Sequence, residues 1–152
     1  MNAIEINSLT KNFKKSVAID NISLNVEEGE IFGFLGPNGA GKSTTMMILT
    51  TLLKPTSGNA SVYGFDVVTN PSKVRKNIGF VQQEIGIDEY LTARENLQFQ
   101  CKISQIPKEQ IKKRIEEVLD LVELTEKQDD QSITFSGGMR KRLDIACGLI
   151  HR

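Results

Sequence analysis

Residues 36 to 43 constrain the fold of this chain more than any other stretch. They read Gly-Pro-Asn-Gly-Ala-Gly-Lys-Ser, which fits the pattern G-x-x-x-x-G-K-[S/T]. The apolar run Ile31–Leu35 precedes them, and the helix-compatible run Thr44–Leu53 follows. In this context of strand, loop and helix, the glycines let several backbone N–H groups point at one anion, and the helix N-terminus adds a partial positive charge. The pattern therefore predicts a phosphate-binding loop in which Lys42 reaches the β- and γ-phosphates and Ser43 ligates Mg²⁺.

Hydrophobic periodicity predicts an α/β fold around this loop. Ala3–Leu9 alternates in part, which predicts an outer strand, and Ile22–Val26 alternates strictly, which predicts a second, half-buried strand. Ile31–Leu35 and Ile78–Val81 are continuous apolar runs, the pattern of strands buried on both faces of a parallel sheet. The helix Thr44–Leu53 is apolar around much of its circumference and is expected to be mostly buried. The remaining features are a polar turn at Lys11–Ser16, a short strand at Ala60–Tyr63, and a helix that begins at Asn70 and Pro71.

From Thr92 onward the sequence predicts helices. Thr92 and Glu95 fit a capping box, Pro107 begins a second helix, and Ser136 caps a third. The apolar face of the second helix consists of Ile111, Ile115, Val118, Leu119 and Val122, and that of the third of Met139, Leu143, Ala146 and Ile150. The predicted fold is a P-loop NTPase core with N-terminal antiparallel β strands and a helical subdomain inserted after the strand that ends at Gln83.

The start of the third helix carries a second motif, Phe-Ser-Gly-Gly-Met-Arg-Lys-Arg at residues 135 to 142. Each glycine in a helix costs roughly 1 kcal/mol relative to alanine, so two in one turn indicate a role beyond helix formation. Ser136, Gly137 and Gly138 at a helix N-terminus form either a second anion-binding surface or a loose helix cap.

Composition excludes several classes of function. Lys and Arg number 19 and Asp and Glu also number 19, so no long-range field favours nucleic acid. No apolar run approaches the about 18 residues that a membrane-spanning helix needs, and the N-terminus carries no secretory signal pattern. Cys101 and Cys147 are typical of reduced packing residues in a cytosolic protein. With His151 as the single histidine, the sequence offers no plausible set of zinc ligands.

On these motifs the sequence resembles the ATP-binding subunit of ABC transporters over essentially the whole chain. Residues 36–43 match the Walker A loop, and Phe135–Lys141 resembles the family signature, as FSGGMRK in place of the commoner LSGGQ. Gln83 matches the Q-loop glutamine, with a solvated loop amide, or Gln82 as the true match, as alternatives. Phe13 matches the aromatic residue that stacks on adenine, the alternative being a loop residue that packs locally. Within the family, the similarity is strongest to exporters of the daunorubicin-resistance and sodium-extrusion type.

The resemblance implies a composite site. In this family two domains dimerise head to tail, and ATP lies between the Walker A loop of one and the signature of the other. The implied nucleotide-binding residues are Phe13, Gly36, Pro37, Asn38, Gly39, Ala40, Gly41, Lys42, Ser43, Thr44, Gln83, Ser136, Gly137 and Gly138, with Ser43 and Gln83 also at the Mg²⁺. The implied partners are a second ATP-binding domain and transmembrane permease subunits, which the helical subdomain from Thr92 to about Glu123 would contact at the cytoplasmic face of the membrane. The implied division is a core with a β subdomain over residues 1–90, a helical subdomain over 91–135 and a signature helix over 136–152.

Several family elements have no match in these residues, namely the Walker B strand with its Asp, the adjacent catalytic Glu, the D-loop and the switch His. No apolar run ends in Asp-Glu, so there is no Walker B Asp and no catalytic Glu, and His151 precedes the position of the switch His. We therefore assign no catalytic residue, because neither the Mg²⁺-ordering carboxylate nor the one that polarises water is present. We expect the residues to be the N-terminal part of a longer ATPase, to lack Mg-ATPase activity alone, and to leave Ile31–Leu35 with an unpaired edge where the Walker B strand would lie.

Two other functions fit the same motifs. One is an ABC-type ATPase without a membrane partner, acting on ribosomes or in DNA repair, although such proteins usually carry two cassettes. The other is a non-catalytic truncated remnant that binds nucleotide at best.

Overall fold

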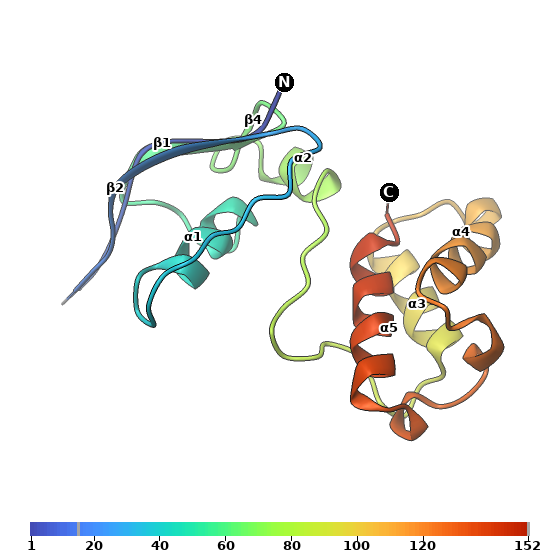
Figure 1. The fold of residues 1–152 in the computed structure, drawn as a ribbon. Coiled ribbons are helices and arrows are strands. Elements are labelled where there is room, and N and C mark those ends of the chain that lie inside the picture. The colour runs from blue at the N-terminus through green and yellow to red at the C-terminus, as the bar shows by residue number, and fades with distance from the viewer. Residues whose placement is uncertain (15, 152) are drawn as a thin grey trace. The chain divides into compact units, whose positions relative to one another are not determined.

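The computed structural model describes residues 1–14 and 16–151 (Figure 1). These residues form two compact units, an N-terminal unit from Met1 to Ile78 and a C-terminal unit that begins at Gly79. Each unit has its own cluster of buried apolar side chains. The division into a core, a helical subdomain and a signature helix remains a prediction.

The N-terminal unit is built on a four-stranded antiparallel sheet. Its strands are β1 (Asn2–Phe13), β2 (Ser16–Glu27), β3 (Ser57–Val62) and β4 (Phe65–Asp66), in the order β2-β1-β3-β4. Across the sheet, Ile6 of β1 lies opposite Leu24 of β2 and Ala60 of β3. The predicted N-terminal antiparallel strands and the short strand near Ala60 are confirmed.

The partial alternation of β1 has a local cause. Ser8 has a φ of 48°, and the pairing of β1 with β2 shifts between Ile6 and Leu9. This irregularity re-aims the chain, so that Ile6 and Leu9, three residues apart, are both buried. The predicted turn at Lys11–Ser16 is wrong over its first residues: β1 continues through Phe13, and Lys11 pairs with Ile19 in the ladder.

One face of this sheet packs on helices. The core joins Ile6, Leu9 and Ile19 of the sheet to Ile48 of α1 (Lys42–Leu49) and Val74 of α2 (Pro71–Lys76). In Figure 1, β1 and β2 form a long curved ribbon that lies over α1. The helix α1 ends earlier than predicted and is less buried, because among the described residues its packing partners lie on the side that faces the sheet. On its other side Met46 and Met47 are 40% and 42% exposed, and Leu52, which lies after the end of the helix, is 62% exposed.

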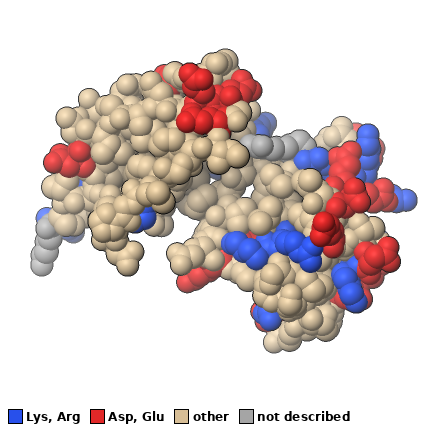
Figure 2. Space-filling view, in the orientation of Figure 1, with Lys and Arg blue, Asp and Glu red and all other residues tan. Residues whose placement is uncertain are grey.

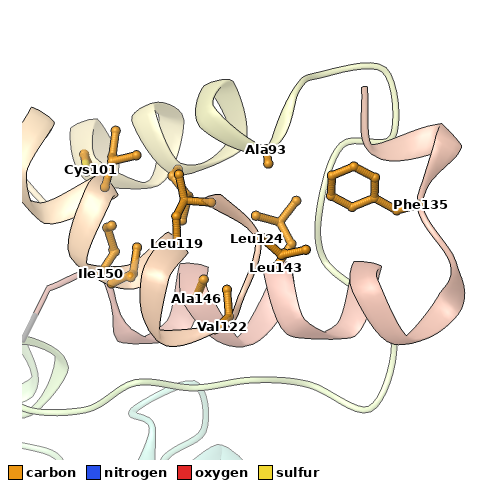
Figure 3. Packing of buried hydrophobic residues seen from close by; sticks show 12 residues of the cluster. Ala93, Cys101, Leu119, Val122, Leu124, Phe135, Leu143, Ala146 and Ile150 are labelled. Atoms are coloured by element: carbon orange, nitrogen blue, oxygen red, sulfur yellow. The ribbon is translucent and has the colours of Figure 1, made fainter. Parts of the chain in front are cut away.

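The C-terminal unit is helical. Its helices are α3 (Ala93–Ile103), α4 (Lys108–Leu121) and α5 (Gly137–Leu149), with the short 3₁₀ helices η1 (Thr125–Lys127) and η2 (Ser132–Thr134) between the last two. The predicted apolar faces of α4 and α5 are confirmed, since Ile115, Val118, Leu119, Leu143, Ala146 and Ile150 are all buried. In Figure 3 the labelled side chains gather between the helices, with Phe135 and Ala93 toward one end and Cys101 at the other.

Local signals set the helix boundaries as predicted. Thr92 and Glu95 form the capping box: the Glu95 N–H donates to the Thr92 hydroxyl at 3.2 Å, and the Thr92 N–H donates to the Glu95 carboxylate at 2.8 Å. Asn70 and Pro107 are the residues at which α2 and α4 begin. These outcomes depend only on neighbouring residues, which is why the sequence indicates them well.

The two apolar runs predicted as buried parallel strands are not strands. Ile31–Leu35 runs as an extended segment in which Ile31 is 101% and Leu35 is 92% exposed. No residue that the structure describes pairs with it, and a strand requires a neighbour for its backbone N–H and C=O groups. Ile78–Val81 also forms no strand, and Phe80 within it is 39% exposed. The parallel sheet is therefore a correction, although the α/β fold class itself is confirmed.

A buried amide ties the start of α3 to the preceding loop. The Asn96 side-chain N–H₂ donates to the carbonyls of Asp88 (2.9 Å) and Thr92 (3.0 Å) and to the hydroxyl of Ser132 (3.2 Å). Its amide oxygen accepts from the Asp88 N–H at 2.9 Å. Asn96 thereby holds three separate stretches of the C-terminal unit together.

Both cysteines are packing residues, as predicted. Burial raises the pKa of Cys101 and raises that of Cys147 to about 12, so neither thiol ionises readily.

On the side of the C-terminal unit that carries α5, Lys and Arg side chains form a band with Asp and Glu beside it (Figure 2). Among the described residues, no helix is both long enough and apolar enough to cross a bilayer.

Candidate functional site

The loop before α1 has the backbone geometry that its glycines permit. Gly39 and Gly41 have φ values of 82° and 84°, in the left-handed region, and Gly41 is the N-cap of α1. A Cβ on Gly41 would lie 2.2 Å from the carbonyl oxygen of Ala18, on β2. Gly41 is therefore required both by its backbone angle and by the close approach of the neighbouring strand.

Lys42 lies over this loop. Its ammonium donates to the carbonyl oxygens of Gly36 and Pro37, both at 2.7 Å, and the side chain thus curves back toward the chain that precedes it. The Ala40 N–H closes the turn by donating to the Pro37 carbonyl at 3.2 Å. An ammonium beside a tight turn is placed to attract phosphate oxygens.

The N-terminus of α1 adds further donors. No side chain of the described residues caps the helix at Gly41, so the first N–H groups, those of Lys42, Ser43 and Thr44, have no capping acceptor. The Ser43 side chain is exposed and Thr44 is half-buried. These free donors and hydroxyls fit the phosphates of a nucleotide and a hydroxyl-ligated Mg²⁺.

Thr45 is a supporting residue that the sequence did not indicate. Its side chain is buried, its hydroxyl donates to the Gly41 carbonyl at 3.0 Å, and its N–H donates to the same oxygen at 2.8 Å. The loop therefore joins the helix through two hydrogen bonds at a single carbonyl. The only sequence signal for this supporting role is a threonine directly after Lys42, Ser43 and Thr44. That signal is ambiguous, because threonine also occurs as an ordinary helix residue.

Phe13 is at the end of β1, in the same unit. The ring is 46% exposed, and the Lys11 ammonium lies 5.2 Å from its centroid. Exposure leaves ring surface for stacking against a base, and the adenine contact stays a prediction. Phe13 is absent from the apolar cluster of this unit, but the Lys11 contact is a local one, so the local-packing alternative stays open.

Ser136 and the glycines after it begin α5 in the C-terminal unit. The Ser136 hydroxyl accepts from the Met139 N–H at 3.3 Å, which makes Ser136 the N-cap as predicted. A Cβ on Gly137 would meet nothing within 4 Å, and one on Gly138 only the Ser136 hydroxyl at 3.9 Å. Packing within the described chain therefore does not require either glycine, and this favours a close approach by something outside it.

Gln83 is exposed and belongs to the C-terminal unit. Neither Gln83 nor Gln82 has a side-chain hydrogen bond to any other residue that the structure describes. The Gln82 carbonyl, in contrast, accepts from the Lys141 ammonium at 2.6 Å. The choice between Gln82 and Gln83 as the metal-side glutamine stays open, and Ser43 and Gln83 belong to different units.

The N-terminal unit carries a glycine-rich loop of the phosphate-binding type, and the C-terminal unit carries a helix that begins with a serine cap and two glycines. Together these features define a nucleotide-binding domain of the ATP-binding cassette class. The chain matches the ABC transporter family over residues 19–152, and it belongs to that family. This confirms the resemblance drawn from the Walker A and signature motifs.

Named relatives refine the comparison. The chain is 42% identical over 148 residues to the daunorubicin/doxorubicin resistance ATP-binding protein DrrA of Streptomyces peucetius, covering 97% of this chain and 45% of the relative. It is 41% identical over 149 residues to the linearmycin resistance ATP-binding protein LnrL of Bacillus subtilis, covering 98% and 48%. The chain thus spans just under half the length of these relatives.

A solved structure supports the fold. The ATP-binding cassette MJ0796, solved as a dimer in a post-hydrolysis state with ADP and Pi, superposes with a TM-score of 0.80 at 30% identity. The match covers 97% of this chain and 69% of that one. The fold of the chain is therefore that of an ABC-type ATPase domain.

Proposed function

We propose that this chain is the ATP-binding part of the ATPase subunit of an ABC exporter, and that it couples ATP binding to transport. One observation carries the proposal: the Gly41 backbone, held in the left-handed region against Ala18, begins a helix with no side-chain cap, and the Lys42 ammonium is held at the loop before that helix. That combination suits a polyphosphate and not a neutral ligand. Export as the direction follows from the similarity to resistance proteins.

Each group has a separate task in this proposal. Residues 36–41 wrap the β-phosphate with backbone N–H groups, while Lys42 exchanges its carbonyl partners for phosphate oxygens. Ser43 holds Mg²⁺, with Gln83 as a further ligand, and Thr44 contacts the α-phosphate side through its hydroxyl and N–H. The bound Mg²⁺ neutralises charge on the phosphate oxygens. Phe13 stacks on the adenine.

Ser136, Gly137 and Gly138 act on a second molecule. We propose that they contact the γ-phosphate of ATP held by a partner copy in a head-to-tail dimer. The open space over Gly137 supports this, because a phosphate can approach the backbone there with no side chain in the way. The structure of MJ0796, which is a dimer with ADP and Pi bound, supports the proposal that this chain also dimerises.

The membrane partner is proposed to contact the helical part of the C-terminal unit. Phe99 and Ile103 lie four residues apart on α3 and are 60% and 59% exposed, so they form an apolar strip on one side of that helix. We propose that this strip meets transmembrane permease subunits at the cytoplasmic face of the membrane. A copurification test with the permease would lose the partner on Phe99→Ser and keep it on Lys113→Ser, at an exposed position of α4.

We propose that residues 1–152 do not hydrolyse ATP on their own. The sequence contains no apolar run that ends in Asp-Glu, and attack by water needs a carboxylate to orient it. Residues 1–152 are then expected to bind Mg-ATP without turning it over above background. Turnover that disappears on Lys42→Ala would contradict this part of the proposal.

Binding itself is tested by calorimetric titration of residues 1–152 with Mg-ATP. Lys42→Ala is expected to weaken binding at least about 100-fold, since the phosphate side loses a charge-assisted contact. Lys76→Ala, an exposed lysine of α2 in the same unit, serves as the matched control and should bind as the parent does. Equal binding by the Lys42→Ala variant and the parent would overturn the proposed function.

A further inference from the structure

The segment that carries Gln83 is fastened to α5 on both sides of that residue. The Lys141 ammonium donates to the Gln82 carbonyl at 2.6 Å, and the Gly86 N–H donates to the Asp144 carboxylate at 3.2 Å. Lys141 and Asp144 are also bonded to each other, at 3.0 Å, through the second carboxylate oxygen. One turn of α5 thus holds the two ends of a short loop.

The burial of Asp144 separates this arrangement from an ordinary surface ion pair. Its side chain is only 10% exposed, whereas that of Lys141 is 37% exposed. A carboxylate with so little solvent needs partners for both oxygens, and here it has an ammonium and a backbone N–H. The hydrogen bonding of Asp144 therefore depends on the loop being in place, since among the described residues the Gly86 N–H is the only hydrogen-bond donor to its Oδ1 atom.

The chain before the loop also lies against α5. A Cβ on Gly79 would be 2.3 Å from the Gly148 carbonyl oxygen, and a Cβ on Gly148 would be 2.7 Å from a methyl group of Val81. The segment from Gly79 to Gly86 therefore follows α5 from its end toward its middle. Between the two fastening points Gln83, Glu84 and Ile85 are exposed.

We propose that Lys141 and Asp144 are positioning residues for Gln83. They fix the loop that presents Gln83 to the same helix that begins at Ser136, so both elements move as one body. The inference rests on the proposed function. In that function Gln83 is a ligand of the Mg²⁺ bound to one ATP, and Ser136 contacts the ATP held by the partner copy. We call the contacts of Lys141 with the Gln82 carbonyl and of Asp144 with the Gly86 N–H the latch. Through the latch, a displacement of Gln83 on nucleotide binding also displaces the signature residues at Ser136, and the two composite sites become coupled.

The latch itself is tested without nucleotide, by hydrogen exchange on the full chain. Asp144→Ala removes the acceptor of the Gly86 N–H, and exchange of that amide is expected to rise about tenfold. Asp144→Asn keeps an oxygen for the Gly86 N–H, so its increase should be smaller. Unchanged Gly86 exchange in Asp144→Ala would overturn the latch, and slow exchange in α3 establishes that each variant is folded.

The role of Lys141 is tested with two substitutions, one that removes its positive charge and one that keeps it. Lys141→Met removes the donor to the Gln82 carbonyl and should raise exchange across residues 82–86 several-fold, while Lys141→Arg keeps a cation there and should restore the parent rate. Lys112→Met, at an exposed position of α4 with no ion pair among the described residues, is the matched control. The same exchange in Lys141→Met and Lys141→Arg would overturn the assignment of Lys141.

The positioning role is tested by adding Mg-ATP. In the parent chain, exchange of residues 82–86 and 137–139 should slow over the same range of Mg-ATP concentration. In Lys141→Met, exchange in the two segments should slow at different Mg-ATP concentrations. In Lys141→Arg, it should again slow over the same range of concentration in both segments. A common response in Lys141→Met would overturn the coupling. If Mg-ATP leaves the parent chain unchanged, the proposed function fails, whereas the latch is still decided by the exchange rates without nucleotide.

Discussion

The backbone of Gly41 lies so close to the carbonyl oxygen of Ala18 that a Cβ on Gly41 would be 2.2 Å from it. This contact joins the phosphate-type loop to β2 and fixes where α1 begins. The loop is therefore shaped by the sheet beside it and not only by its own glycines.

Gly41→Ala is expected to lower the free energy of unfolding by about 2 to 4 kcal/mol, since a left-handed φ and an overlap with Ala18 act together. Urea unfolding at equilibrium measures this difference. Gly39→Ala is the matched control: Gly39 has a similar φ of 82° but nothing within 4 Å of the added Cβ, so only about 1 kcal/mol is expected. Equal losses of unfolding free energy in the two variants would show that the contact with Ala18 contributes nothing to stability.

Asn96→Ala is expected to cost about 3 kcal/mol, because the Asp88 and Thr92 carbonyls and the Ser132 hydroxyl lose a buried donor. Thermal and urea unfolding give the value. Gln98→Ala, on an exposed position of the same helix, should change stability by no more than about 0.5 kcal/mol. A loss below about 1 kcal/mol for Asn96→Ala would mean that the loop does not depend on this amide.

Leu35→Lys is expected to leave the stability of residues 1–152 within about 0.5 kcal/mol of the parent, since Leu35 is 92% exposed, and to reduce self-association through the unpaired apolar run. Light scattering against concentration, beside thermal unfolding, measures both effects. Val17→Lys, at a 61% exposed position of β2, controls for added charge alone. A large loss of stability in Leu35→Lys would place Leu35 in a core and contradict the structure.

Asp66 should contribute a pH-dependent term to stability. Hydrogen bonds from the Thr69 N–H, then from the Thr69 hydroxyl and the Val68 N–H, hold the pKa of Asp66 below its ordinary value of 3.8. A lowered pKa in the folded state means that the stabilisation is fully present above the unfolded pKa and disappears as the pH falls through the folded pKa. The stability difference between the parent and Asp66→Asn should therefore shrink below about pH 4. A difference that stays constant from pH 6 to pH 2 would contradict this.

Local sequence patterns predicted much of both units correctly. The capping box at Thr92 and Glu95, the N-cap at Ser136 and the apolar face of α4 all follow from residues within one or two helical turns of each other. In the Walker A loop, the positive φ angles likewise fall on glycines that the motif already specifies. These local features need no distant partner, and the sequence alone therefore determined them, together with membership of the family. The contact of Gly41 with Ala18, in contrast, is a tertiary one.

Tertiary structure decided whatever depends on contact between distant residues. Ile31–Leu35 has the composition of a buried strand, yet strand formation depends on a neighbour's backbone, and no described residue supplies one. Likewise, no spacing rule pairs Lys141 with the Gln82 carbonyl or Asp144 with the Gly86 N–H, which lie 59 and 58 residues away. Hydrogen bonds of this kind are fixed by how the chain packs, because the same residue types elsewhere in the sequence face solvent.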